Sequence, residues 1–326
     1  MKNLNRARRV GITAIGCSVL LRLFAAGIPE ELYFRLIQPN IDAVLMKLET
    51  GQNVRFSSYS ESFSPDFMES PPPYLPQTTE PSLPVFSGNE KVDLYYAVRK
   101  QPDIEALLEK PLQWNLFGAE PSVLILHTHT TESYTKQGES YKETSSWRTL
   151  DEDYNMLSIG HLVEHILEEN GIAVVQDRTV HDHPSYSGSY IRARQSIRDI
   201  LDEYKNIRLV LDLHRDAAGT ENNQMRTKAV VNGKTSAQLM VVIGTNHEGY
   251  EENLSLGLKL HIQLEKQAEG IMRPLQLRSQ RFNQDLSSGA LLIEIGAAGN
   301  SHREAWIAAE ELAKAVVALA GGTASE

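Results

Sequence analysis

The sequence predicts an α/β fold with a mostly parallel sheet and helices on both faces. From about Pro121 onward, short β-rich runs alternate with segments of helical periodicity. Alternation of this kind implies right-handed crossovers between strands, which build parallel sheets covered on both sides. Ionisable residues also follow several of the predicted strands. The 326-residue length leaves room for one such domain and for accessory sequence.

Each element is predicted from its hydrophobic period and from the turn residues beside it. The helix over 154–169, for example, has apolar residues at Met156, Ile159 and Val163, and Asn170-Gly171 marks its end. The same criteria predict strands over 123–126, 172–175, 207–213, 238–243 and 291–295, and helices over 189–204, 252–267 and 302–319.

Residues 1–28 have the layout of a signal anchor. Four basic residues lie within the first nine positions, and the mostly apolar stretch 10–28 follows them. A bilayer requires about 20 such residues, and positive charge before a span stays on the cytoplasmic side. We therefore expect a single-pass protein of the cell membrane, with everything after the span outside the cytoplasm.

Residues 29–118 are predicted to form a juxtamembrane segment and a Pro/Ser-rich spacer. The stretch from about residue 51 to residue 91 is rich in Ser, Pro, Glu and Thr. Such a composition buries too little apolar surface to fold and favours extended conformations. The folded domain is therefore predicted to occupy residues 119–326.

Charge and cysteine content exclude several classes of function. The formal net charge is -10, and no dense Lys/Arg run follows the first ten residues, which argues against a nucleic-acid surface. Cys17 is the single cysteine, so disulfides within the chain and thiolate-rich zinc sites are excluded. A metal ion would have to be held by His, Asp or Glu.

A metal-dependent hydrolytic site is predicted at the carboxyl edge of the sheet. The strand over 123–126 leads to His129 and Glu132, and the strand over 207–213 leads to His214. Ligands of open α/β sheets gather at this edge. Zinc in hydrolases takes three N/O ligands and a water, so these three residues are the predicted Zn²⁺ ligands. Glu294, in an otherwise apolar strand, is the predicted general acid/base.

Three nearby residues have open roles. His127 lies two positions before His129, and alternate strand positions face one side, so it either replaces His129 as ligand or orients the site. Asp212 either supports the metal ligands without binding the metal itself, or is a buried carboxylate paired with a nearby donor. Arg215 is the predicted catalytic arginine, which would hold a substrate carboxylate or an oxyanion.

These residues occur in segments that resemble a known family, that of stage II sporulation protein P within the zinc-dependent N-acetylmuramoyl-L-alanine amidase group. The resemblance covers about residues 121–319, and the anchor and spacer also match the family's layout. The motifs that carry it are residues 127–134, Asp182 with 184–186 and 189–190, 212–217, 283–285 and 292–296.

The resemblance implies a zinc amidase/exopeptidase-like fold over 119–326 and a peptidoglycan substrate. It implies cleavage between muramic acid and the first alanine of the stem peptide, and endopeptidase cleavage of stem cross-links. It also implies work at the sporulation septum during engulfment, with stage II sporulation proteins D and M as partners. The wider amidase group places its first zinc histidine in a Gly-His-Gly-Gly loop and its glutamate well downstream. No Gly flanks His129 here, so the third ligand is either Glu132 or an acid such as Asp151 or Glu152.

Two other classes of function fit parts of the pattern. A non-catalytic wall-binding domain would keep the fold without the metal, and the presence of Glu294 argues against it. A zinc carboxypeptidase-like exopeptidase also uses a His-x-x-Glu pair, a later His and a Glu base. In that case Arg215 would bind a terminal carboxylate.

Overall fold

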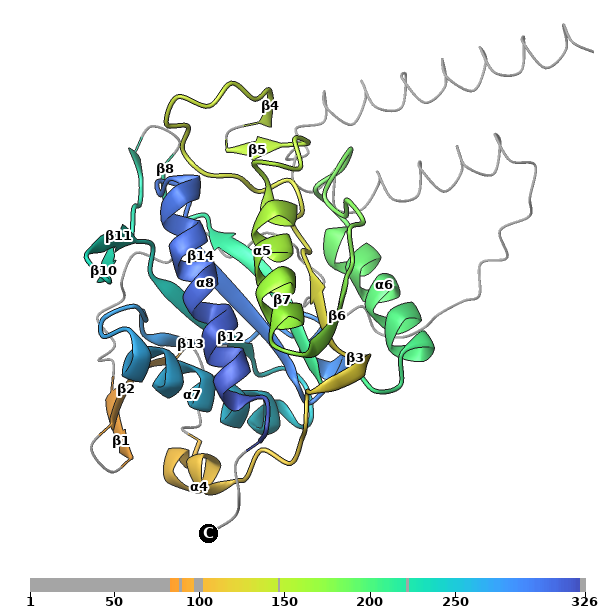
Figure 1. Cartoon of the computed structure of the whole chain (residues 1–326), viewed down its shortest axis with the longest axis vertical. Coiled ribbons are helices and arrows are strands. Elements are labelled where there is room, and N and C mark those ends of the chain that lie inside the picture. The colour runs from red at the N-terminus through yellow and green to blue at the C-terminus, as the bar shows by residue number, and fades with distance from the viewer. Residues whose placement is uncertain (1–82, 88–89, 97–101, 146, 221–222, 323–326) are drawn as a thin grey trace, which may run out of the picture. The chain divides into compact units, whose positions relative to one another are not determined.

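The structure, a computed structural model, describes residues 83–87, 90–96, 102–145, 147–220 and 223–322. Its centre is an eight-stranded sheet of order β1-β2-β13-β12-β14-β7-β3-β6 (Figure 1). The strands of this sheet are β1 (Leu83–Ser87), β2 (Glu90–Tyr96), β3 (Gly118–Leu126), β6 (Ile172–Gln176), β7 (Leu209–Asp216), β12 (Leu239–Gly244), β13 (Leu275–Arg278) and β14 (Ala290–Ala297).

The helices connect these strands. They are α4 (Ile104–Glu109), α5 (Met156–Glu169), α6 (Ser189–Glu203), α7 (Tyr250–Gln267) and α8 (His302–Leu319), with a short 3₁₀ helix η2 (Gln284–Leu286). Asn155 begins α5 by accepting a hydrogen bond from the Leu157 N–H, and Ser301 begins α8 in a capping box with Glu304. Three small hairpins complete the structure: β4 (Glu143–Ser145) with β5 (Arg148–Thr149), β8 (Gly219–Thr220) with β9 (Asn223–Gln224), and β10 (Ala229–Val231) with β11 (Lys234–Ser236).

The sheet is mostly parallel, as predicted. Only the β1/β2 and β12/β14 pairs of the eight-stranded sheet are antiparallel. From β3 the chain passes through α5 to β6 on one side, and then through α6 to β7 on the other side of β3. The strand order thus reverses between β3 and β7, and the carboxyl ends of two such strands border a crevice in which ligands bind.

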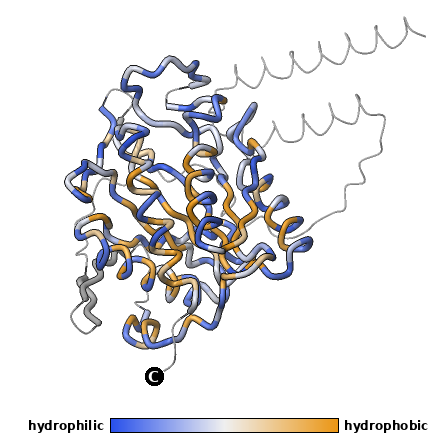
Figure 2. Tube along the Cα trace, in the orientation of Figure 1, coloured by the Kyte–Doolittle hydropathy of each residue, from blue (hydrophilic) through white to orange (hydrophobic). Residues whose placement is uncertain are grey.

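Alternate strand residues point to opposite faces of the sheet, so apolar side chains lie on both faces, and helices cover both. Ile125 of β3 packs with Ile159 of α5 in the main core, to which α7 and α8 also contribute. Leu124 belongs to a second cluster with Ala193 and Ile197 of α6. Figure 1 shows α5 and α8 in front of the sheet, and Figure 2 shows hydrophobic residues concentrated in the central strands.

The structure corrects the predicted start of the folded region and the predicted ends of two strands. The segment predicted as spacer, 29–118, contains β1, β2 and α4, and β2 pairs with β13 inside the main sheet. The folded region therefore begins at or before Leu83. The strands β7 and β14 also end later than predicted, because main-chain pairing continues past the apolar runs. His214 thus lies within a strand and not in the loop after it.

The predicted membrane anchor at 1–28 lies outside the described residues. Among the residues that are described, no helix is long and apolar enough to cross a membrane.

Candidate active site

Three ionisable side chains share the sheet face that α6 covers. Val210 of β7 packs under α6, so Asp212 and His214, two and four positions later, point to the same side. Glu294 of β14 is the registered neighbour of His214 in the parallel β14/β7 pair. Strand register therefore places the predicted general acid/base beside a predicted metal ligand.

His214 is held between two carboxylates. Its Nε2 lies 3.0 Å from Oδ1 of Asp212, and its Nδ1 lies 3.8 Å from Oε2 of Glu132. The Thr128 N–H and hydroxyl donate to the two Asp212 oxygens at 2.9 and 2.7 Å. Burial acts to lower the pKa of His214, but the Asp212 carboxylate outweighs burial and raises this pKa to about 9. Without a metal, the two side chains form a buried charged pair.

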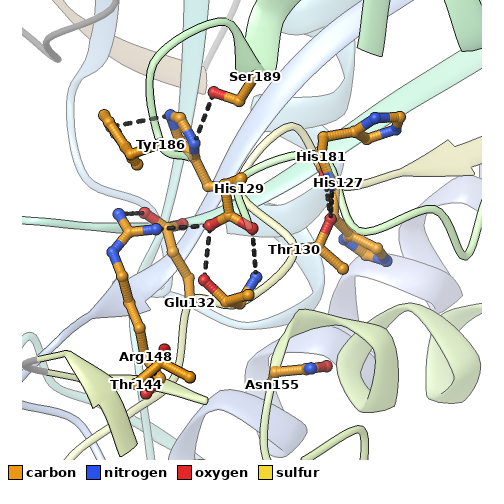
Figure 3. Close-up of polar contacts among 12 residues, drawn as sticks. His127, His129, Thr130, Glu132, Thr144, Arg148, Asn155, His181, Tyr186 and Ser189 are labelled. Carbon is orange, nitrogen blue, oxygen red and sulfur yellow. Dashed lines mark hydrogen bonds and ion pairs between the residues drawn. The ribbon is translucent and has the colours of Figure 1, made fainter. Parts of the chain in front are cut away.

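His129 follows the end of β3 and approaches His214 from the α6 side. The two imidazole rings lie edge to face with centroids 5.2 Å apart. Nε2 of His129 contacts the Tyr186 hydroxyl at 3.0 Å, and Nδ1 contacts the Ser189 hydroxyl at 3.2 Å (Figure 3). Burial first, and the nearby His214 second, hold the pKa of His129 well below its usual value. His129 is therefore a neutral imidazole, the form that binds metal ions.

The Glu132 carboxylate accepts hydrogen bonds from two donors. The main-chain N–H of Arg215 donates to Oε2 at 3.2 Å, and the Arg148 guanidinium donates to Oε1 at 3.2 Å. The Glu132 side chain is only 4% exposed, and these two donors hydrogen-bond both of its oxygens.

Glu294 is a partly buried acid with one oxygen that lacks a donor. Its Oε2 is inaccessible to solvent and has no hydrogen-bond partner among the described residues. Burial, and then the negative charge of Asp216, raise the pKa of Glu294 to about 8, although His214 acts in the opposite direction. A carboxyl group that titrates near neutral pH can both accept and donate a proton during turnover.

His127 lies on the other face of the sheet, which corrects the expectation that it shares a side with His129. Its Nδ1 is 3.2 Å from the Leu213 carbonyl and its Nε2 is 3.1 Å from the Gln176 amide nitrogen, below α5. The strand β3 ends at Leu126, and the chain then turns, so strand alternation does not continue to His129. Figure 3 shows the two rings turned away from each other. Burial lowers the pKa of His127 to about 4.

Arg215 is buried beside Glu132. Its Nε and Nη2 each donate to a main-chain carbonyl, those of Ser133 and Trp147, at 3.1 Å, and Nη1 lies 3.6 Å from Oε1 of Glu132. The side chain is 4% exposed. This guanidinium therefore holds the loop after Glu132, and its catalytic role stays a prediction.

The alternative third ligands lie elsewhere. Asp151 and Glu152 are both exposed, and Glu152 pairs with Arg178 at 2.7 Å. Of the three acids considered from sequence, Glu132 is the one with a described contact to His214.

Arg148 is a site residue that sequence reasoning missed. It lies in β5, and its guanidinium bridges Glu132 at 3.2 Å and Asp182 at 2.6 Å. It also lies 4.6 Å above the Tyr186 ring. No local pattern in the sequence identifies Arg148, whereas Tyr186 and Asp182 belong to motifs that carried the family resemblance without an assigned role.

The three predicted metal ligands lie near one another but do not form a preformed metal centre. The structure brings His129, Glu132 and His214 together, and two imidazoles with a carboxylate are a donor set that zinc uses in hydrolases. In the part of the chain that the structure describes, however, no group of three or more His, Cys, Asp or Glu is arranged so that it could hold a metal ion.

Comparison with known proteins adds sequence relatives. The sequence profile of the family "Stage II sporulation protein P" matches residues 68–317. Stage II sporulation protein P of Bacillus subtilis (strain 168) is 26% identical over 241 residues, which are 71% of this chain and 58% of that protein. The chain thus spans somewhat more than half the length of this curated relative.

Solved structures with a similar arrangement include two bacterial amidases. N-acetylmuramoyl-L-alanine amidase AmiC2 of Nostoc punctiforme is 14% identical with a TM-score of 0.37, and the match covers 62% of this chain and 97% of that one. The N-acetylmuramyl-L-alanine amidase Ami1 from Mycobacterium smegmatis is 13% identical with a TM-score of 0.39, covering 64% and 99%.

Proposed function

Because the chain belongs to the stage II sporulation protein P family, we propose that it is a peptidoglycan hydrolase with N-acetylmuramoyl-L-alanine amidase activity. The observation that supports this most directly is the convergence of His129, Glu132, His214 and Glu294 at the carboxyl edge of β3, β7 and β14. Three potential metal donors beside an acid that titrates near neutral pH suit the hydrolysis of an amide bond.

We propose further that the enzyme depends on zinc, with His129, Glu132 and His214 as ligands. Nδ1 of His214 and Oε2 of Glu132 are 3.8 Å apart, close to the distance of about 3.3 Å between two ligands of one tetrahedral zinc. When bound, zinc would supply a Lewis acid and a water of lowered pKa. Both ring nitrogens of His129 contact hydroxyls, so binding would require His129 to give up one of these contacts.

The chain's own groups then have distinct tasks. The Asp212 carboxylate forms an ion pair with His214 at Nε2 and leaves Nδ1 on the side of Glu132. Carboxylates commonly accompany metal-binding histidines. Glu294 takes a proton from the attacking water at a carboxylate oxygen and returns it to the leaving amine. The burial that raises the pKa of Glu294 also matches it to work at neutral pH.

The setting of this activity is likewise a proposal. We propose that residues 1–28 anchor the protein in the cell membrane with the enzyme outside the cytoplasm, as the order of charged and apolar residues favours. By family membership, the site of action would be the sporulation septum during engulfment, with stage II sporulation proteins D and M as partners and endopeptidase activity on stem cross-links.

The test of activity is digestion of isolated sacculi by the purified full-length chain, followed by mass analysis of the products. An amidase releases stem peptides with a free N-terminal alanine and leaves glycan strands intact. Release of single C-terminal residues alone would identify an exopeptidase of the carboxypeptidase type. Binding to sacculi without any released product would identify the non-catalytic alternative.

The test of zinc dependence is elemental analysis of purified variants. We expect His214→Ala to lose zinc, and the matched control His161→Ala, which alters an exposed histidine of α5, to retain it. Metal that stabilises the folded state should also raise the melting temperature of the wild type but not of His214→Ala. Full zinc occupancy in His214→Ala would remove His214 from the proposed site.

A further inference from the structure

A pocket with no assigned ligand adjoins the proposed catalytic cluster, which consists of His129, Glu132, His214 and Glu294. Its volume is about 560 Å³, and its wall is formed by the β4–β5 hairpin, the turn after β3 and the loop after β6. Two of its lining residues contact the cluster directly, since Tyr186 contacts His129 at 3.0 Å and Arg148 contacts Glu132 at 3.2 Å. The lining includes Thr131, Thr144, Ser145, Arg148, Asp182 and Tyr186.

The charge that the pocket presents is that of Arg148. Its side chain is 18% exposed, whereas those of its two partners, Glu132 and Asp182, are 4% and 0% exposed. Asp182 is also occupied by Thr131, whose N–H and hydroxyl donate to it at 3.0 and 2.7 Å. The guanidinium is therefore accessible to a ligand in the pocket, whereas the two carboxylates that bind it are buried.

Arg148 keeps donors for a ligand while it is held in place. A guanidinium has five N–H donors, and the two ion pairs engage one nitrogen each. The Tyr186 ring below the guanidinium limits its rotation, and the exposed Thr144 and Ser145 add hydroxyl groups at the same wall. A fixed cation beside these hydroxyl groups suits a carboxylate ligand.

We propose that this pocket is the subsite for the stem peptide and that Arg148 binds a carboxylate of that peptide. The inference rests on the proposed function, because it concerns the same catalytic cluster. In peptidoglycan the carboxylates belong to the peptide, whereas the glycan consists largely of neutral sugars. The Arg148 guanidinium is therefore expected to bind the stem peptide and not the glycan. The second stem residue carries a free or amidated carboxylate. It lies one residue, about 3.5 Å, beyond the alanine at the scissile bond, which keeps it near the cluster.

The experiment compares two soluble muropeptides that differ only at the second stem residue, one with a free carboxylate and one with a carboxamide. We expect the full-length wild type to cleave the acidic form with a kcat/KM about 10- to 100-fold higher, as for a charge-assisted contact. Arg148→Gln should reduce this ratio to about one, chiefly by raising KM for the acidic form. The matched control Arg178→Gln changes an exposed arginine that pairs with Glu152, and should keep the wild-type ratio.

The ratio separates recognition from folding, because a loss of folded enzyme lowers both rates equally. If Arg148→Gln does not fold, Arg148→Lys serves instead, and its loss of fork geometry should still lower the ratio. Equal rates of the wild type on both muropeptides, or a wild-type ratio in folded Arg148→Gln, would overturn the proposal.

A binding measurement distinguishes failure of this inference from failure of the proposed function. Calorimetric titration of the wild type with the tripeptide L-alanyl-γ-D-glutamyl-L-lysine, and with its α-amide at the second residue, needs no turnover. Preferential binding of the acid, lost in Arg148→Gln, would support the subsite even if neither muropeptide is cleaved. Equal binding of both peptides, or binding of neither, would refute the subsite whatever the enzyme cleaves.

Discussion

Replacement of Glu294 by Gln should stabilise the metal-free protein at neutral pH. Burial raises the pKa of Glu294 to about 8 from a usual 4.5, so the unfolded chain binds fewer protons than the folded chain between these values. Folding stability then falls by about 1.4 kcal/mol per pH unit above pH 4.5, which amounts to about 3 kcal/mol at pH 7. Gln has nearly the same shape and no charge, so Glu294→Gln avoids this loss.

The assay is urea unfolding of wild type and variant with a chelator present, because a bound cation would alter the local charge balance. We expect Glu294→Gln to be more stable by about 3 kcal/mol at pH 7 and equal to wild type at pH 4. Glu120→Gln, at an exposed position of β3, is the control and should change little. A less stable Glu294→Gln at pH 7 would mean that Glu294 is a stabilising anion, and the proposed catalytic role would lose its physical basis.

Three further predictions concern the scaffold. Asp285→Asn should cost about 1.5–3 kcal/mol, because Arg194 contacts both Asp285 oxygens, at 2.8 and 2.6 Å. Burial raises the pKa of Asp285, but the ion pair with Arg194 outweighs burial and lowers it. In urea unfolding, the stability difference between Asp285→Asn and wild type should therefore vanish as the pH falls through that pKa. Gly160→Ala should lower the melting temperature, since its Cβ would lie 2.5 Å from Nε2 of the buried His127. Overpacking costs about 1–3 kcal/mol and exceeds the gain in helix propensity of up to about 1 kcal/mol. Ser301→Ala should cost about 1 kcal/mol in urea unfolding through loss of the α8 capping box, whereas Ser301→Thr should be nearly neutral.

Periodicity and turn residues were sufficient to predict the α/β class and most of the central elements. The helix predicted over 154–169 is observed as Met156–Glu169, and the strand predicted over 172–175 as Ile172–Gln176. Local signals of this kind depend on neighbours in sequence and survive without tertiary information. The strands β1 and β2 were missed because their residues lie in or beside the Pro-rich stretch, and only pairing with β13 incorporates them into the sheet.

Within the site, the sequence by itself determined which residue types stand in or just after β3, β7 and β14. It thereby determined the potential metal ligands and the proposed general acid/base, Glu294. Only the tertiary structure decided which way each side chain points. The turn after Leu126 sends His127 and His129 to opposite faces, and main-chain carbonyls hold Arg215 inward. Arg148 reaches Glu132 and Asp182 from a separate hairpin. Contacts between residues so far apart in the chain depend on packing and register, which no local pattern encodes.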